Sequence, residues 1–327
     1  ISLLFYFLGL IGFWGSLVFY NSYLPDIAFT EQQDEVSARG FSFGYVGSVL
    51  LLIVNLAMIM MPDVFGISGT KGEAAMKAMR YSFIMVGIWW IIFSQYTYYY
   101  LPKGNKNANR KVTHHVVFNG YKELKKVWHL LSENLALKKY LWSFFVYSMA
   151  VQTVMLIATY FGSQEIQWSS QSESTTGLII CILLIQLVAI IGATLTSKAS
   201  AKYGNIPTLI TINSFWIILC VLAYFITLPI HFYVMAGFVG LVMGGIQALS
   251  RSTYSKLLPE TKDLTSYFSF YDLAEKIGLA IGTLTFGIIE GMMDIRTSIL
   301  ALVVFFVLGL ILLIRIPKQN TTHETSN

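Results

Sequence analysis

The sequence predicts an all-α polytopic membrane protein with nine transmembrane spans. Of its 327 residues, 55% are hydrophobic and only 12% are charged, about half the charged fraction of a soluble domain. A membrane-crossing helix needs about 20 mostly apolar residues. Nine segments meet this requirement: 2–23, 41–61, 81–101, 140–162, 176–197, 207–228, 231–250, 266–290 and 297–316. Buried helices of a soluble protein do not explain them, because such helices average about 11–12 residues and show a polar face.

The Lys and Arg residues predict the orientation of these spans. If the loop 102–139 is cytoplasmic, 17 of the 22 basic residues fall on that side and four on the other. Cytoplasmic loops carry such an excess. We therefore expect the linker 102–139 and the C-terminal tail 317–327 in the cytoplasm of a multi-pass protein, in a bacterial inner (plasma) membrane. The net charge of +5 suits contact with anionic lipid, so the lipid bilayer is an expected partner and nucleic acid is not.

The basic linker divides the chain into three spans in residues 1–101 and six in residues 140–316. Its apolar residues Leu124, Trp128, Leu131 and Leu135 repeat at helical spacing. This pattern predicts an amphipathic helix on the inner membrane surface, or else a simple tether between two bundles. Six spans after a central basic loop are typical of one half of a carrier built from two six-helix halves. We therefore expect the first three spans to be the remainder of an N-terminal half-bundle that lacks about three helices.

Several motifs, in order, resemble the vacuole-effluxer-like branch of the major facilitator superfamily. Residues 19–27 (FYNSYLPDI) and 37–48 (SARGFSFGYVGS) look like the segment that joins the fourth and fifth helices of that family. Gln152-Thr153, followed by YFG at 160–162, resembles its seventh helix, and residues 244–252 (GGIQALSRS) resemble its tenth. The resemblance covers essentially the whole chain and implies that the nine spans are helices four to twelve.

The resemblance implies transport of a small solute without ATP hydrolysis, and in fungal members amino-acid export from the vacuole. It also places Gln152 and Gln247 in two helices that line the central cavity. We expect these two amides to bind substrate, with helix–helix hydrogen bonding as the alternative. Thr153 adjoins Gln152, and Tyr20 and Asn21 lie at the end of the first span; these three are further candidates for the cavity.

Charged residues within or beside the spans are candidates for gating. Asp272, Glu275 and Lys276 share one helical face, because they are three and four residues apart. They form either a gating or ion-coupling cluster or an interfacial salt bridge in which Lys276 extends toward the inner surface. Arg251, at the end of the tenth helix, is predicted to pair with Asp272 or Glu275 and latch an inward gate. Arg39 lies at the cytoplasmic exit of the first span.

Two sets of glycines predict close helix packing. One set is Gly237, Gly240 and Gly244, and the other is Gly278 and Gly282. Small residues four apart let two helix backbones approach closely, and helices packed in this way can rock against each other during alternating access.

The sequence thus favours a secondary active transporter that moves a small solute, with a proton as the expected coupling ion. It contains no GxxxxGK[ST] loop of an ATP-driven motor, and neither a cofactor nor a metal site is expected. A membrane scaffold or receptor without transport is the main alternative. An intramembrane enzyme that uses the Asp272 and Glu275 carboxylates is less favoured, because the charges lie near one membrane edge; no enzymatic activity is therefore expected.

Overall fold

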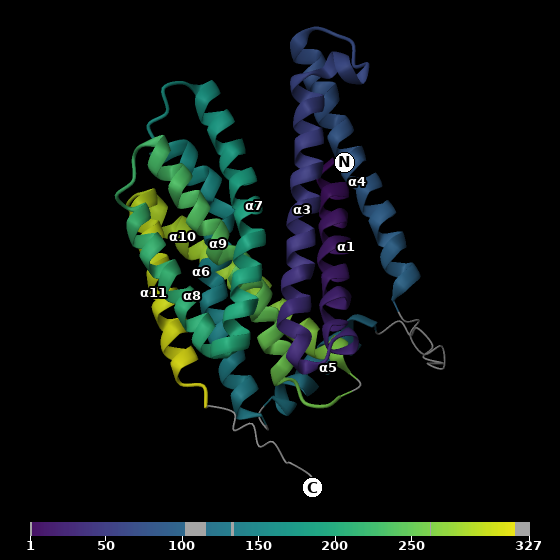
Figure 1. Ribbon diagram of the computed structural model, residues 1–327, viewed down its shortest axis with the longest axis vertical. Coiled ribbons are helices and arrows are strands. Elements are labelled where there is room, and N and C mark those ends of the chain that lie inside the picture. Colours follow the sequence, from purple (N-terminus) through teal and green to yellow (C-terminus); the bar gives the residue numbers. More distant parts are fainter. Residues whose placement is uncertain (1, 102–115, 132–133, 262, 318–327) are drawn as a thin grey trace. The chain divides into compact units, whose positions relative to one another are not determined.

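A computed structural model describes residues 2–101, 116–131, 134–261 and 263–317, and these residues are helical without any β-strand (Figure 1). The long helices are α1 (Ser2–Ser22), α3 (Gln33–Met60), α4 (Lys71–Tyr100), α6 (Leu135–Glu165), α7 (Gln171–Tyr203), α8 (Asn205–Ala223), α9 (Pro229–Leu257), α10 (Leu264–Met292) and α11 (Ile295–Ile314). The short ones are α2 (Leu24–Ile27), η1 (Thr30–Gln32), η2 (Pro62–Phe65) and α5 (Val116–Leu130). Each long helix contains or overlaps one predicted span.

Eight of the long helices are long and apolar enough to cross a membrane, judged over the described residues. The ninth, α10, has 29 residues and differs in carrying Asp272, Glu275 and Lys276 in its first half. Helix α5 corresponds to the predicted amphipathic helix of the linker only in part: Leu124 and Trp128 lie on it, Leu131 directly follows it, and Leu135 begins α6. Linker residues 102–115 and tail residues 318–327 lie outside the described residues, so the predicted domain division and orientation stay predictions.

Side chains with a clear preference for helix ends mark several of the boundaries. Asn134, Ser170 and Asp294 each accept a hydrogen bond from a backbone N–H in the first turn of α6, α7 and α11, which satisfies a donor that the helix leaves free. Gly204 has φ +89° between α7 and α8, a conformation that a residue with a side chain rarely adopts. Pro229 occupies the first position of α9, where its missing N–H costs nothing.

The chain divides into two compact units, residues 1–43 with 117–327 and residues 44–116. In the first unit the helices pack in the order α7, α9, α8, α11, α6 and α10, and α1 packs against α10. In the second unit, Met58 on α3 and Ala74 and Ala78 on α4 form a small core with Ile67.

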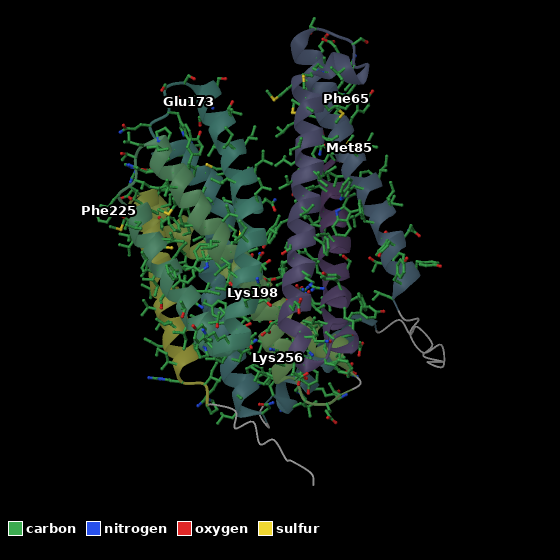
Figure 2. The ribbon with its side chains drawn as sticks, viewed as in Figure 1. Phe65, Met85, Glu173, Lys198, Phe225 and Lys256 are labelled. Carbon is green, nitrogen blue, oxygen red and sulfur yellow. The ribbon has the colours of Figure 1, made fainter. Side chains whose placement is uncertain are left out.

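One end of the first unit is called the linker end below. There α7 and α9 finish, α8 and α10 begin, and residues 117–131 of α5 lie close by. In Figure 2, Lys256 marks this end of the bundle, and Glu173 marks the opposite end. Helix α5 contacts the linker end through Trp128, whose ring lies 6.1 Å from that of Trp142 and 5.8 Å from that of Phe270.

The predicted packing glycines lie at close helix contacts, with one exception. A Cβ atom added to Gly240 would lie 2.6 Å from the Ile185 carbonyl oxygen, and one added to Gly244 would lie 2.1 Å from that of Ala189. Helix α7 therefore approaches α9 backbone to backbone. Gly278 and Gly282 lie at the contact with α6, where an added Cβ would be 2.9 Å from Ser148 Oγ and 2.3 Å from the Met149 carbonyl oxygen, respectively.

The prediction is wrong for Gly237, because no atom lies within 4 Å of its Cβ position. This residue is one turn nearer the start of α9 than Gly240, and its Cβ position does not face α7, although α7 also approaches α9 further along, where a Cβ on Gly177 would lie 2.8 Å from the Tyr233 hydroxyl. On α7, Gly192 supplies a close contact that the sequence did not suggest: its added Cβ would lie 2.0 Å from the Leu241 carbonyl oxygen.

Candidate functional site

A cluster of polar side chains lies in the first half of α10. The Gln152 side chain on α6 donates a hydrogen bond of 2.6 Å to Glu275 Oε1, and Glu275 Oε2 lies 2.6 Å from Lys276 Nζ. Asp272 Oδ1 lies 3.5 Å from the same ammonium group, which stands 3.6 Å from the centre of a Trp14 ring on α1. These five residues are called the α10 cluster. Polar groups at membrane depth are costly unless they are paired, and this cluster pairs four of the predicted residues.

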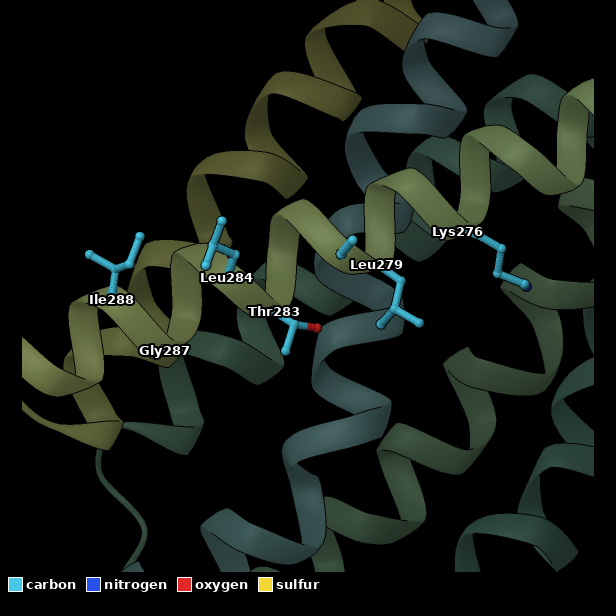
Figure 3. A pocket seen from close by; sticks show the side chains of 7 residues that line it. Lys276, Leu279, Thr283, Leu284, Gly287 and Ile288 are labelled. Carbon is cyan, nitrogen blue, oxygen red and sulfur yellow. The ribbon is translucent and has the colours of Figure 1, made fainter. Parts of the chain in front are cut away.

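A groove of about 650 Å³ runs along α10 from the cluster (Figure 3). It is lined by Lys276, Leu279, Ala280, Thr283, Leu284, Gly287 and Ile288. Lys276 and Ile288 mark its two ends in Figure 3. The Thr283 hydroxyl is buried and has no hydrogen-bond partner among the described residues. Lys276 is thus the charged group at the end of a mostly apolar groove.

A buried carboxylate, Asp34 near the start of α3, connects four helices at the linker end. Asp34 Oδ2 accepts from Lys256 Nζ at 2.7 Å and from Ser200 Oγ at 2.8 Å, while Oδ1 accepts from Asn205 Nδ2 at 2.8 Å. The donors come from α9, α7 and α8. The Asp34 side chain is 5% exposed. Three donors, one of them charged, compensate for the loss of its hydration.

A second connection at the linker end is made by Arg251 of α9. Its Nε donates to Ser37 Oγ at 3.0 Å, its Nη2 to the Ser37 carbonyl at 3.0 Å, and its Nη1 to Asn21 Oδ1 at 3.2 Å. The guanidinium also lies over the rings of Tyr20 and Phe41, at 5.2 and 4.6 Å. Every one of these partners lies within residues 20–41. Arg251 is therefore a buried cation held by neutral groups of the N-terminal part of the chain.

This arrangement corrects the predicted pairing of Arg251 with Asp272 or Glu275. In the described structure the two carboxylates pair with Lys276, and Arg251 is bound to Ser37 and Asn21 instead. The pairing was predicted from the side of the membrane alone, which does not determine the direction that a long side chain takes.

Buried tyrosines connect the end of α9 to α6 and α10. Tyr271 of α10 stacks on Tyr254 of α9 at 4.8 Å and on Phe144 of α6 at 4.1 Å. Tyr147 of α6 bonds to Ser250 Oγ at 2.7 Å. These tyrosines thus join α6 and α10 to the part of α9 that carries Arg251.

Other predicted site residues have different surroundings. Thr153 is fully buried and bonds to the Met149 carbonyl, next to the close contact of Gly282, so it belongs to the α6–α10 contact. Gln247 Nε2 lies 3.5 Å from Met155 Sδ. Arg39 forms an exposed ion pair with Glu35, a type that contributes little to stability.

Sequence reasoning did not find Asp34, Ser200, Asn205 and Lys256. They occur in segments expected to be cytoplasmic, where polar residues are common, and nothing in the sequence connects positions so far apart. Gly40 is a further residue whose role only the structure shows: a Cβ there would lie 2.7 Å from the Tyr20 hydroxyl and 3.2 Å from Arg251 Nη2. Glycine at this position leaves room for the Arg251 contacts.

Solved transporters of the major facilitator superfamily share this fold. The fucose:proton symporter FucP of E. coli matches with a TM-score of 0.62 over 91% of this chain and 72% of its own, at 14% identity. A FucP structure in the outward conformation matches with a TM-score of 0.64 at 13% identity. Such low identity shows the fold alone, and it confirms the predicted major-facilitator-type helical bundle.

The chain belongs to the family described as vacuole effluxer Atg22 like, which matches residues 1–326. The MFS-type transporter YxiO of Bacillus subtilis is 29% identical over 321 residues, covering 98% of this chain and 72% of YxiO. Autophagy-related protein 22 of Vanderwaltozyma polyspora is 25% identical over 319 residues, covering 86% of this chain. The chain spans 55% of that fungal relative. The family consists of transporters and not of enzymes, as the sequence predicted, and the chain is an integral multi-pass membrane protein.

Proposed function

We propose that this protein is a secondary active transporter that moves a small solute across the membrane by alternating access. The observation that carries this proposal is the set of contacts at the linker end. Asp34 and the residues around Arg251 connect the start of α3 and the end of α1 to α7, α8 and α9. Contacts that close one end of a helix bundle, and that consist of polar bonds which water can replace, suit a gate that opens during transport.

Amino acids are the proposed solute class. The family description names effluxers, and the α10 cluster offers both an ammonium group and carboxylates. A zwitterion presents the complementary charges, and Gln152 adds an amide that bonds to either end. The proposed substrate-contacting residues are Gln152, Gln247, Tyr20 and Asn21, and the proposed coupling ion is the proton.

The proposal extends to topology. Residues 1–101 form the remainder of an N-terminal half-bundle and residues 140–316 a C-terminal half-bundle, with the linker 102–139 and the C-terminus in the cytoplasm. A bacterial inner membrane is the proposed location. The linker end is then the cytoplasmic gate.

Reconstitution of the full-length protein in liposomes tests the proposal. Uptake of each of the 20 radiolabelled amino acids is measured under an imposed pH gradient, with empty liposomes as the control. Flux above the control for some of them is expected. A purified, folded protein without flux for any amino acid would remove the solute class, and absence of flux over a broader solute panel would favour a scaffold or receptor.

A further inference from the structure

Helix α5 is a part of the linker whose role the proposed transport does not explain. Leu124 and Val127 on α5 and Leu131, which directly follows it, are three and four residues apart and so share one helical face. Val127 and Leu131 are 1% and 2% exposed and belong to the hydrophobic core of the first unit. The apolar face of α5 is therefore occupied by the protein itself and is not available for insertion into a bilayer.

The opposite face of α5 is basic. Lys122, Lys125 and Lys126 are exposed on it. Lys126 lies 3.7 Å from a Glu123 oxygen and 3.8 Å from an Asp263 oxygen, so nearby carboxylates balance its charge. Lys122 and Lys125 have no ion pair or hydrogen bond with any residue that the structure describes. The docked helix thus presents uncompensated positive charge on its free side.

Two tryptophans at this place each have a lysine one helical turn before them. Lys125 precedes Trp128 by three residues on α5, and Lys138 precedes Trp142 by four on α6, and both spacings put the pair on one helical face. The two indole rings contact each other, with centres 6.1 Å apart, and are 44% and 46% exposed. Lys138, like Lys125, has no charged partner among the described residues. The indole contact therefore joins two Lys–Trp pairs into one surface, called the Lys–Trp surface below.

The chemistry of the Lys–Trp surface fits the headgroup of an anionic phospholipid. Tryptophan rings gather at the level of the headgroups in membrane proteins. The span predicted for α6 begins at residue 140, between Lys138 and Trp142, which places this surface at that level. Each lysine near an anionic membrane surface strengthens binding about fivefold, and the phosphate of a headgroup supplies the negative charge that Lys125 and Lys138 lack.

We propose that the Lys–Trp surface binds the headgroup of an anionic phospholipid in the membrane leaflet at the linker end. The ammonium groups of Lys125 and Lys138 bind the phosphate, and the rings of Trp128 and Trp142 lie beside the upper part of the acyl chains. Helix α5 is then held to the bundle by its apolar face and to the membrane by its basic face. The inference depends neither on the solute nor on the coupling ion proposed above.

Photo-cross-linking of the full-length protein in phosphatidylcholine vesicles tests the inference. The probe is a trace of phosphatidylglycerol that carries a photoreactive diazirine on its headgroup, and mass spectrometry after chymotrypsin digestion identifies the labelled peptides. Labelling within residues 121–131 and 138–145 is expected. A phosphatidylcholine probe with the diazirine at the same distance from the phosphate should label these residues several-fold less. Equal labelling by the two probes would overturn the inference, because phosphatidylcholine has no net charge.

Paired substitutions separate a headgroup site from general attraction. Lys125→Gln with Lys138→Gln is expected to lower labelling of these residues by up to about 25-fold, which is about fivefold for each lysine, while Lys125→Arg with Lys138→Arg should keep it. Lys198→Gln with Lys202→Gln is the matched control, because it removes the same charge from exposed positions at the end of α7, and it should leave labelling unchanged. Equal losses in the two glutamine pairs would overturn the inference. Full displacement of the probe by free glycerol 3-phosphate would also overturn it, because the ligand would then be a soluble phosphate. No solute is present, so absence of amino-acid flux contradicts the proposed function without affecting this result.

Discussion

Asp34 Oδ2 lies 2.7 Å from Lys256 Nζ, although 222 positions separate the two residues in the chain. The pair is mostly buried, with the side chains 5% and 21% exposed. Removal of one partner of a buried ion pair costs about 3–5 kcal/mol because the other charge stays buried and unpaired. We expect Asp34→Asn and Lys256→Met each to lower the thermal unfolding temperature in detergent, and the double variant to lose less than the sum of the two.

Glu35→Gln is the matched control, because Glu35 is the next residue on α3 and its ion pair with Arg39 is exposed. Its effect is expected to stay within about 0.5 kcal/mol. Equal losses for Asp34→Asn and Glu35→Gln would show that burial does not distinguish the two pairs.

A second prediction concerns the effect of a larger side chain at the contact between α7 and α9. A Cβ at Gly244 would lie 2.1 Å from the Ala189 carbonyl oxygen, so Gly244→Ala forces the two helices apart. Overpacking of this kind costs about 1–3 kcal/mol. Gly237→Ala is the control on the same helix, since its Cβ meets no atom within 4 Å and alanine favours a helix by about 0.5–1 kcal/mol. Thermal unfolding of the two variants should therefore move in opposite directions, and equal shifts would contradict the packing.

A third prediction concerns the contacts that hold α5 against the linker end. Trp128 contacts the rings of Trp142 and Phe270, so Trp128→Ala is expected to release α5 and to speed limited proteolysis at residues 116–131 several-fold. Tyr121→Ala removes an aromatic ring of the same helix that is 70% exposed and should leave the rate unchanged. Equal rates in both variants would show that the Trp128 contacts do not hold the helix.

A fourth prediction concerns the pH dependence of the first turn of α11, which Asp294 caps. Hydrogen bonds from the Thr297 backbone N–H and side chain hold the pKa of Asp294 below its usual range. A carboxyl with a lowered folded-state pKa stabilises the fold above its unfolded pKa of about 3.9 and loses this contribution as the pH falls through the folded value. Amide exchange in residues 295–298 should therefore accelerate in that acidic range. The Asp294→Asn variant caps the helix without a charge. After correction for the intrinsic pH dependence of amide exchange, its exchange rate should not accelerate in the acidic range. If the acceleration is unchanged in this variant, another group causes it.

The sequence predicted the helices well because each span is a local property. About 20 apolar residues in a row produce a membrane helix whatever surrounds them, and all nine spans appear as long helices. The spacing of Asp272, Glu275 and Lys276 was equally local, because residues three and four apart share a helix face. The prediction of a close helix contact failed for Gly237. A small residue permits such a contact, but whether another helix lies there depends on the tertiary packing.

By itself, then, the sequence determined that this is a helical multi-pass membrane protein of the major facilitator type, with a charged face on the segment that forms α10. Only the tertiary structure decided which groups meet. It placed Arg251 on Ser37 and Asn21 and not on the α10 carboxylates, and it joined Asp34 to Lys256. The physical reason is that hydropathy and helical periodicity act over one or two turns, whereas a buried charge takes the partners that the packing of distant helices brings within reach.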